Sequence, residues 1–297
     1  MKKIVILALH LSVGGIERVI TNVSNLLCEN NDVTIISTYK INENPSFEID
    51  DRINIEYLLE DLKPNRKELK DAIKNLNIIE IIKQSFISAK VLYLRKKLMI
   101  KAIKKIDADI VISTRAMHNK WLGKYAKKGI IKIAQEHNHH NNNKKYIKKV
   151  IRSLKNIDFF MPPSNELSKF YEKLLKNKKT KVIYIPNLIE NDSKEISELK
   201  EKVILSVGRL ERIKGFLDLI EVFKIVNQTY PDWKLKIAGS GSQEEELQQK
   251  IYHEKLEKNI ELVRRKNKRR IKKIVFRIFC LCYDIIFRII WISSCGS

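Results

Sequence analysis

Apolar and polar residues alternate in blocks along the chain, and these blocks predict strands and helices in turn. Residues 2–9 form a short apolar run typical of a buried strand, and residues 17–29 place apolar side chains at helical spacing. Similar apolar runs predict strands at residues 32–38, 53–59, 109–113, 130–134, 158–162 and 181–185. Helical patterns lie within residues 64–106, 144–154 and 164–175. Strands and helices that alternate in this way predict a parallel α/β domain with right-handed connections.

A polar and acidic stretch at residues 190–201 interrupts the pattern and predicts a linker. A second α/β pattern follows, with strands predicted at residues 202–207, 233–238 and 259–263 and helices at 215–229 and 243–257. We therefore expect a first Rossmann-like domain over residues 1–190 and a second over residues 191–263, which is incomplete because it has only three strands. Residues 264–297 do not continue the alternation, and we expect them to form an aberrant basic and apolar tail.

The chain carries a net charge of +23, which is spread unevenly. Residues 264–297 contain ten Lys and Arg and one Asp, so this tail alone contributes +9. A cation excess of this size is compatible with peripheral contact with an anionic membrane, and a solvated Lys-rich surface is the alternative. The four cysteines form no C-x-x-C pair, which favours a reducing, cytoplasmic compartment. The apolar run at the N-terminus lacks a small-residue cleavage site, which favours a strand over a signal peptide.

Two predicted loops have the residues expected of a phosphate site, since ligands of parallel sheets bind beyond the carboxyl ends of the strands. Gly14 and Gly15 follow the first strand, where they would let the backbone approach a phosphate at the N-terminus of the next helix. A simple tight turn is the alternative for this pair. Arg209 and Lys214 follow the first strand of the second domain and could clamp a pyrophosphate. Their alternative is two exposed basic side chains.

A third loop follows the strand predicted at residues 130–134 and contains several histidines. His137 stands at the carboxyl end of that strand, where it could bond a sugar hydroxyl or handle a proton. A metal site made of His137, His139 and His140 is the alternative, but their spacing fits no standard zinc pattern. We therefore predict no metal site and expect His139 and His140 to lie in a solvated loop.

Five motifs in this order resemble those of glycosyltransferase family 4, also called group 1 glycosyltransferases: GGIERV, EHN, IPN, SVGRL-E-x-x-KG and KLKIAGSG. This is a retaining family with the GT-B fold, in which two Rossmann-like domains face each other, and the resemblance covers about residues 1–263. It implies a nucleotide-diphosphate sugar as the donor. Arg209 and Lys214 match the family's donor-phosphate residues, and Gly15 matches its glycine loop facing the diphosphate. His137 falls at the family's histidine near the transferred sugar.

The resemblance also carries expectations about chemistry and partners. The family needs no metal ion or other cofactor, because the Arg/Lys pair neutralises the diphosphate. The acceptor implied is a glycan or a polyprenyl-linked acceptor, in cell-envelope or capsular polysaccharide biosynthesis. A hexosyltransferase-type enzyme of this kind is expected in the cytoplasm, at the inner face of the cell membrane. The resemblance gives Gly239 and Gly241 a structural role in a glycine turn.

The chain departs from the family after about residue 263. The family continues with S-x-x-E-G/S-F-G and a second glutamate, and these two glutamates contact the donor sugar and the ribose. Residues 264–297 contain neither motif. When this tail is back-translated with A/T-rich codons and shifted by one nucleotide, it gives SVFVMTSYSESFGLVVVE, which contains both glutamates. We therefore hypothesise a single-nucleotide frameshift near residue 263 and expect the chain, truncated in this way, to be inactive.

The alternative function is a non-catalytic protein that binds a membrane surface or nucleic acid through its basic C-terminal tail. A membrane-spanning helix over residues 274–292 is disfavoured, because Arg277, Asp284 and Arg288 would place charges in the bilayer. The tail contains no nucleic-acid-binding motif, so we expect no nucleic-acid partner.

Overall fold

A computed structural model describes residues 1–188, 201–264 and 278–282. The chain divides into two compact units, residues 1–190 and 191–297, and each unit contains its own sheet. The sequence predicts a domain boundary at the same place, in the polar stretch that separates the two α/β patterns.

The first unit is built on a seven-stranded sheet with the order β3-β2-β1-β4-β5-β6-β7, and every neighbouring pair is parallel. The strands are β1 (Lys3–Ala8), β2 (Asp32–Tyr39), β3 (Asn54–Leu59), β4 (Ile110–Ser113), β5 (Ile131–Gln135), β6 (Phe159–Met161) and β7 (Lys181–Val182). The chain begins in the middle of the sheet, moves outward to β3 and then returns to the other side of β1 at β4. This reversal makes β1 and β4 the switch point where ligands of doubly wound sheets bind.

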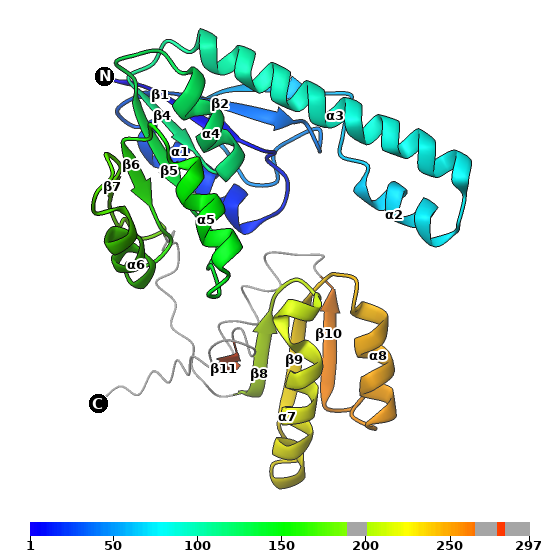
Figure 1. The fold of residues 1–297 in the computed structure, drawn as a ribbon. Coiled ribbons are helices and arrows are strands. Elements are labelled where there is room, and N and C mark those ends of the chain that lie inside the picture. Colours follow the sequence, from blue (N-terminus) through cyan, green and yellow to red (C-terminus); the bar gives the residue numbers. More distant parts are fainter. Residues whose placement is uncertain (189–200, 265–277, 283–297) are drawn as a thin grey trace, which may run out of the picture. The chain divides into compact units, whose positions relative to one another are not determined.

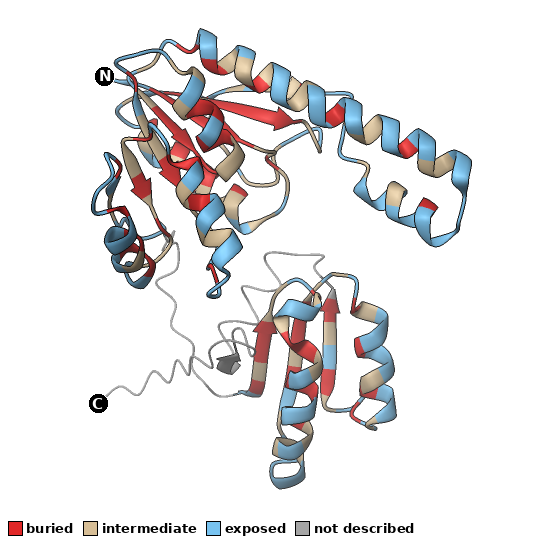
Figure 2. Ribbon diagram, viewed as in Figure 1, coloured by how far each residue is buried: buried red, intermediate tan, exposed pale blue. Residues whose placement is uncertain are grey.

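Helices cover both faces of this sheet (Figure 1). They are α1 (Gly15–Leu27), α2 (Arg66–Lys74), α3 (Ile78–Lys105), α4 (Ala116–Tyr125), α5 (Lys144–Ser153) and α6 (Asn165–Leu175). Alternate residues of β1 point to opposite faces, so Ile4 and Ile6 pack in one core cluster with Ile20 of α1, and Val5 and Leu7 pack in another. The second cluster is formed with α3, α4, α5 and α6, and Figure 2 shows the buried strands between exposed helix surfaces.

The second unit has a four-stranded sheet with the order β10-β9-β8-β11. Its elements are β8 (Glu201–Val207), α7 (Phe216–Thr229), β9 (Lys234–Gly239), α8 (Glu244–His253), β10 (Ile260–Arg264) and β11 (Ile278–Cys282). Phe216, Ile220 and Phe223 of α7 pack against Leu235 and Ile237 of β9 to form its core. Since β9 and β11 pair with opposite sides of β8, the switch point of this sheet lies at the end of β8.

Three elements differ from the prediction. α4 was not expected, because the buried polar residues His118 and Asn119 interrupt its apolar pattern. β7 pairs over two residues rather than the five predicted. The second sheet has one strand more than expected, since β11 comes from the predicted tail and pairs in parallel with the free side of β8.

The remainder of the predicted tail, residues 265–277 and 283–297, lies outside the described residues, and so does most of the segment that the hypothesised frameshift would alter. Within residues 1–188, 201–264 and 278–282, no helix combines the length and the apolar character needed to cross a bilayer.

Candidate functional site

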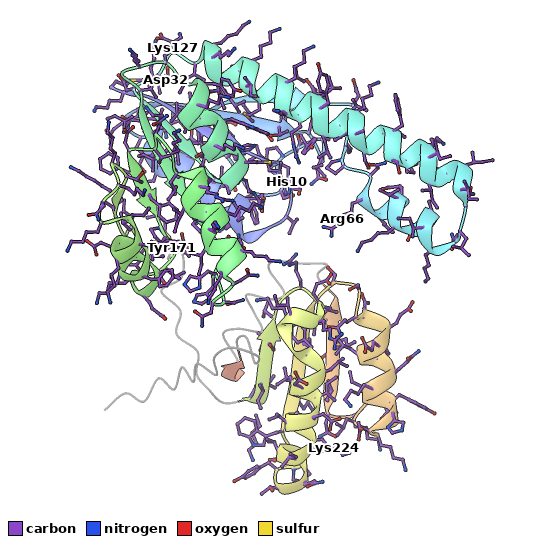
Figure 3. All side chains as sticks on the ribbon, viewed as in Figure 1. His10, Asp32, Arg66, Lys127, Tyr171 and Lys224 are labelled. Atoms are coloured by element: carbon purple, nitrogen blue, oxygen red, sulfur yellow. The ribbon has the colours of Figure 1, made fainter. Side chains whose placement is uncertain are left out.

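In the first unit, polar residues gather where β1, β4 and β5 end. His10 follows β1, Arg115 follows β4, and His137 follows β5, and these three strands are neighbours in the sheet. Figure 3 labels His10 on this side of the unit, and it labels Asp32, where β2 begins, at the opposite side. The cluster therefore lies at the carboxyl edge of the sheet, at its switch point.

Glu17 joins the glycine loop to the end of β4. Its side chain is buried, and its Oε1 lies 3.1 Å from Nη2 of Arg115. A Cβ atom on Gly14 would come within 2.0 Å of Glu17 Oε2, so any other residue at this position would force the buried carboxylate to move. A Cβ atom on Gly15 would meet no atom within 4 Å. Of the two predicted glycines, Gly14 is thus explained by packing, whereas Gly15 faces open space at the start of α1.

His10 belongs to the same cluster. Its Nδ1 lies 3.0 Å from Ser12 Oγ and 3.5 Å from Glu17 Oε1. Burial lowers the pKa of His10, the carboxylate of Glu17 opposes this change, and the charge of Arg115 adds to it. Glu17 therefore has a cation, Arg115, and a neutral imidazole as its neighbours at neutral pH.

His137 lies at the end of β5, as predicted. Burial, followed by the charge of Arg115, lowers its pKa to about 4, so the imidazole is neutral at pH 7. Its Nε2 is buried and has no hydrogen-bond partner among the described residues, and the same is true of Nε of Arg115. A neutral imidazole of this kind can exchange a hydrogen bond with a sugar hydroxyl, but it lacks the second ring proton that an imidazolium could give up as a general acid.

His140 differs from the prediction. Its ring is buried and lies 4.3 Å from the ring of Phe170, so it packs in the core rather than in a solvated loop. The apolar residues that cover it come from α6, which is distant in sequence. His139 is exposed, and its Nδ1 accepts a hydrogen bond from the backbone N–H of Asn141. In the described part of the chain, no three His, Cys, Asp or Glu side chains gather as metal ligands.

In the second unit, Arg209 and Lys214 lie on the loop between β8 and α7, at the switch point of that sheet. Arg209 is exposed and Lys214 is half-buried. Lys214 ends a short 3-10 turn, after which Gly215 adopts a left-handed conformation with φ of 65° and opens α7. The loop thus holds both cations beside a helix N-terminus, where the helix dipole also favours an anion.

Two further glycines allow this loop to pack against the loop that follows β9. A Cβ atom on Gly239 would lie 1.9 Å from the carbonyl oxygen of Gly208, and one on Gly241 would lie 2.3 Å from that of Leu210. The backbone N–H of Leu210 donates to the carbonyl of Ser240 over 3.0 Å. Both glycines are therefore required by close backbone packing. This packing fixes the backbone of the loop between β8 and α7, which carries Arg209 and Lys214 and which we call the cation loop.

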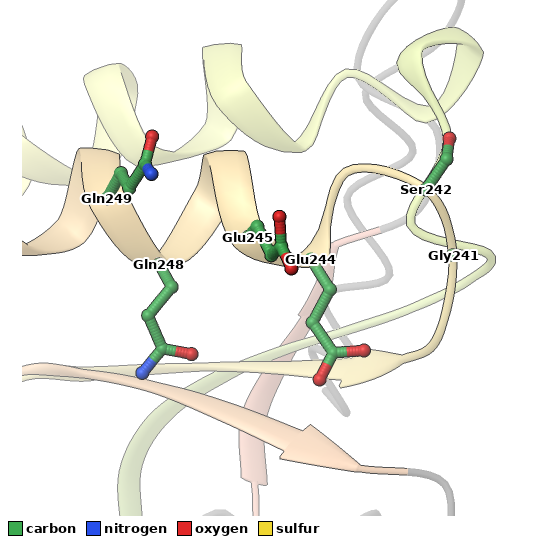
Figure 4. A pocket seen from close by; sticks show the side chains of 6 residues that line it. All are labelled: Gly241, Ser242, Glu244, Glu245, Gln248 and Gln249. Carbon is green, nitrogen blue, oxygen red and sulfur yellow. The ribbon is translucent and has the colours of Figure 1, made fainter. Parts of the chain in front are cut away.

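A depression of about 620 Å³ lies at the start of α8 (Figure 4). It is lined by Gly241, Ser242, Glu244, Glu245, Gln248 and Gln249. Two carboxylates in its wall disfavour a diphosphate by like-charge repulsion. We therefore do not identify it with the predicted donor site, which lies on the β8–α7 loop.

Sequence reasoning missed Glu17, Arg115 and His10. Glu17 lies within the GGIERV motif, so a signal for it was present. Arg115 belongs to no motif, and its link to Glu17 joins residues 98 positions apart. Only the order of the strands brings the two together.

Comparison with known proteins gives the following matches. Residues 187–284 match the profile of a family described as glycosyl transferases group 1. An uncharacterized glycosyltransferase of Haemophilus influenzae is 29% identical over 90% of this chain and 70% of its own length. An exopolysaccharide phosphotransferase of Streptomyces coelicolor is 23% identical over 84% of this chain, which spans only 27% of that protein. The structure of a point mutant of S. aureus TarM, in complex with Fondaparinux, α-GlcNAc-glycerol and UDP, matches with a TM-score of 0.68 and 14% identity, over 95% of this chain and 81% of TarM. The predicted α/β fold of GT-B type is thereby confirmed.

Proposed function

We propose, from the confirmed resemblance of this chain to the group 1 glycosyltransferases, that it binds a nucleotide-diphosphate sugar for transfer of the sugar to a glycan or polyprenyl-linked acceptor. The observation that carries the proposal is the loop after β8, where Arg209 and Lys214 stand beside the N-terminus of α7 at a switch point. The reaction would be of the hexosyltransferase type.

In this proposal the loop stabilises the leaving diphosphate. When the bond between the sugar and the diphosphate breaks, negative charge grows on the phosphate oxygens, and a bond forms between the sugar and an acceptor oxygen. The guanidinium of Arg209 would donate two hydrogen bonds to those oxygens, and the ammonium of Lys214 would act as a point charge. Because these cations and the dipole of α7 neutralise the charge, the proposed reaction uses no metal ion or other cofactor.

The cluster in the first unit would act on the sugar side. We assign His137 the role of hydrogen-bonding a hydroxyl of the transferred sugar, since its imidazole is neutral and its Nε2 is buried without a partner among the described residues. Gly15 would allow the loop backbone to approach the donor, because the space where its Cβ would lie is open. Arg115 would hold Glu17 in place beneath the glycine loop through their ion pair.

The acceptor and the cellular place of the reaction are part of the same proposal. TarM binds UDP and α-GlcNAc-glycerol in its crystal structure, which supports a UDP-type donor and a glycan acceptor for this chain. We place the reaction in cell-envelope or capsular polysaccharide biosynthesis, in the cytoplasm at the inner face of the membrane.

Binding of nucleoside diphosphates and their sugars to the purified chain tests the proposal. Calorimetry with UDP, GDP and ADP and their glucose derivatives should detect one preferred nucleotide, and Arg209→Ala should weaken it about tenfold or more. Binding is the readout, because residues 264–297 lack the expected glutamates and we expect little or no turnover. Lack of affinity for all of these compounds, or equal affinity in Arg209→Ala, would contradict the proposal.

A further inference from the structure

The helices α2 and α3 form a hairpin that projects from the first unit (Figure 1). α3 has 28 residues, which is about 42 Å of helix, whereas the eight residues of β2 extend about 26 Å. The chain enters the hairpin from the carboxyl end of β3 and leaves α3 toward the amino end of β4. The tip of the hairpin, formed by the end of α2 and the start of α3, therefore projects on the side of the sheet that carries His10 and His137.

α3 has two apolar faces rather than one. One face packs Val91, which is buried, with Ile87, Leu94 and Leu98 against Tyr39 and Leu59 of the sheet. The other face is exposed: Ile79 is 81% exposed, Ile82 65%, Phe86 72% and Tyr93 61%. Ile79, Phe86 and Tyr93 are seven residues apart, which is close to two helical turns, so they form one stripe along the helix.

The tip of the hairpin extends this stripe. Ile73 near the end of α2, Leu76 in the connection and Ile78 at the start of α3 are 53%, 82% and 71% exposed, and all three lie within six residues of Ile79 in the chain. Single exposed apolar side chains are ordinary on a protein surface, but a continuous set of this size marks an interaction surface. We call the exposed residues Ile73, Leu76, Ile78, Ile79, Ile82, Phe86 and Tyr93 the apolar stripe.

A row of lysines runs beside the apolar stripe. Lys83, Lys90 and Lys97 are exposed, are spaced by seven residues, and each follows a residue of the stripe by four positions. Residues 66–105 contain twelve Lys and Arg and only three Asp and Glu, a net charge of +9. The hairpin thus combines exposed apolar side chains with an excess of positive charge on the same surface.

We propose that the hairpin docks on an anionic lipid bilayer, with the apolar stripe in the boundary between headgroups and acyl chains and the lysine row on the headgroups. The positive charge of the hairpin favours an anionic bilayer over a second copy of the chain as the partner of this surface. Pairing of two stripes would bring the lysine rows against each other, whereas stable helix pairs place opposite charges there. This surface belongs to the first unit, whereas Arg209 and Lys214 belong to the second. Docking would hold the side of the first unit that carries His10 and His137 close to lipid-borne acceptors, a consequence that rests on the proposed function.

Cosedimentation of the full chain with vesicles tests this surface. We expect binding to vesicles of phosphatidylcholine and phosphatidylglycerol in equal parts, weaker binding in high salt, and little binding to phosphatidylcholine alone. The triple change Ile79→Ser, Ile82→Ser and Phe86→Ser should reduce the affinity at least about tenfold. The matched control is Val222→Ser, Ile225→Ser and Tyr252→Ser, at residues 53%, 67% and 74% exposed in the second unit, which should leave binding unchanged.

The lysine row is tested in the same assay. Lys83→Glu, Lys90→Glu and Lys97→Glu together should abolish binding to the anionic vesicles. Lys127→Glu and Lys128→Glu are the control, because they are exposed just before β5, at the opposite edge, where Figure 3 labels Lys127. Melting curves and nucleotide affinity of all variants should match those of the parent, which separates this surface from the proposed donor site.

Two results would overturn the docking proposal. One is vesicle binding that the stripe and lysine variants leave intact. The other is a chain that ignores anionic vesicles but forms a dimer in solution that Ile79→Ser, Ile82→Ser and Phe86→Ser dissociate. Either result leaves the nucleotide-binding proposal untouched, because that proposal depends on Arg209 and Lys214.

Discussion

The two units present their charged groups in different ways. In the first, Glu17 and Arg115 are tied together across neighbouring strands, and Glu17 is buried. In the second, Arg209 is exposed on a single loop whose backbone is fixed by glycine packing. Buried charges must be paired to be tolerated, whereas exposed charges are free to meet a ligand. Substitutions in the first cluster should therefore act on stability, and substitutions in the second loop should act on binding.

The largest effect is expected for Glu17→Ala. It leaves Arg115 without its partner in a partly buried place, and we expect the free energy of unfolding to fall by about 3 kcal/mol. Urea denaturation measures this change in the free energy of unfolding, with hydrogen exchange of the first unit's backbone amides as the probe. The control is Asp107→Ala, because the Lys3–Asp107 pair is 61% and 85% exposed and should contribute at most about 0.5 kcal/mol. If Glu17→Ala and Asp107→Ala lowered the free energy of unfolding equally, the buried Glu17–Arg115 pair would not stabilise the glycine loop.

The next effect depends on pH. Burial lowers the pKa of His118 to about 3 and that of His137 to about 4, below the usual 6.5. Between pH 6.5 and these values the unfolded chain binds more protons, so the stability contributed by the neutral rings is present above pH 6.5 and is lost as the pH falls. We expect each of these two rings to lower the stability of the first unit by about 2 kcal/mol at pH 5.

The second unit provides the comparison for this pH effect. Residues 191–297 contain only one histidine, His253, and its side chain is 86% exposed. Hydrogen exchange at pH 7 and pH 5 should therefore show the first unit opening while the second stays closed. His137→Gln should reduce the difference in hydrogen-exchange protection between the two units at pH 5, because glutamine does not titrate in this range. Parallel loss in both units would rule out the histidines as the cause.

Gly239→Ala is expected to have the largest effect on stability in the second unit. The new Cβ would lie 1.9 Å from the carbonyl oxygen of Gly208, which is backbone and cannot rotate away. We expect a loss of about 2 kcal/mol in thermal or urea unfolding of the second unit. Gly15→Ala is the matched control in the first unit, since its Cβ would meet no atom within 4 Å. If both changes were neutral, the close packing behind the cation loop would carry no strain.

The difference between the units also explains what the sequence could predict. Arg209 and Lys214 lie five positions apart in one strand–loop–helix segment, so a local motif identifies them. The central strands β1, β2 and β4 follow from apolar runs, because they are buried on both faces. Arg115 cannot be found in this way, since its partner Glu17 is 98 positions away and meets it only after β1 and β4 pair.

Burial of polar residues is the second limit of sequence reasoning. α4 was missed because His118 and Asn119 are buried where a helix usually buries apolar residues, and their partners come from other strands. His140 was expected in solvent because nothing next to it in sequence indicates the rings of α6. In both cases a polar side chain is satisfied or covered by residues far away along the chain, and periodicity carries no information about them.

The smallest expected effect on the free energy of unfolding belongs to the variant that tests the proposed function most directly. Arg209→Ala and Lys214→Ala together should leave the free energy of unfolding within about 0.5 kcal/mol of the parent, because neither residue is buried. They should weaken binding of the preferred nucleoside diphosphate by tenfold or more, which is about 1.4 kcal/mol. Lys202→Ala and Lys234→Ala are the control, since both residues are exposed near the start of their strands, at the opposite edge of the same sheet. A double variant that lost stability instead of affinity would make the β8–α7 loop a structural element, and the contrast between the two units would disappear.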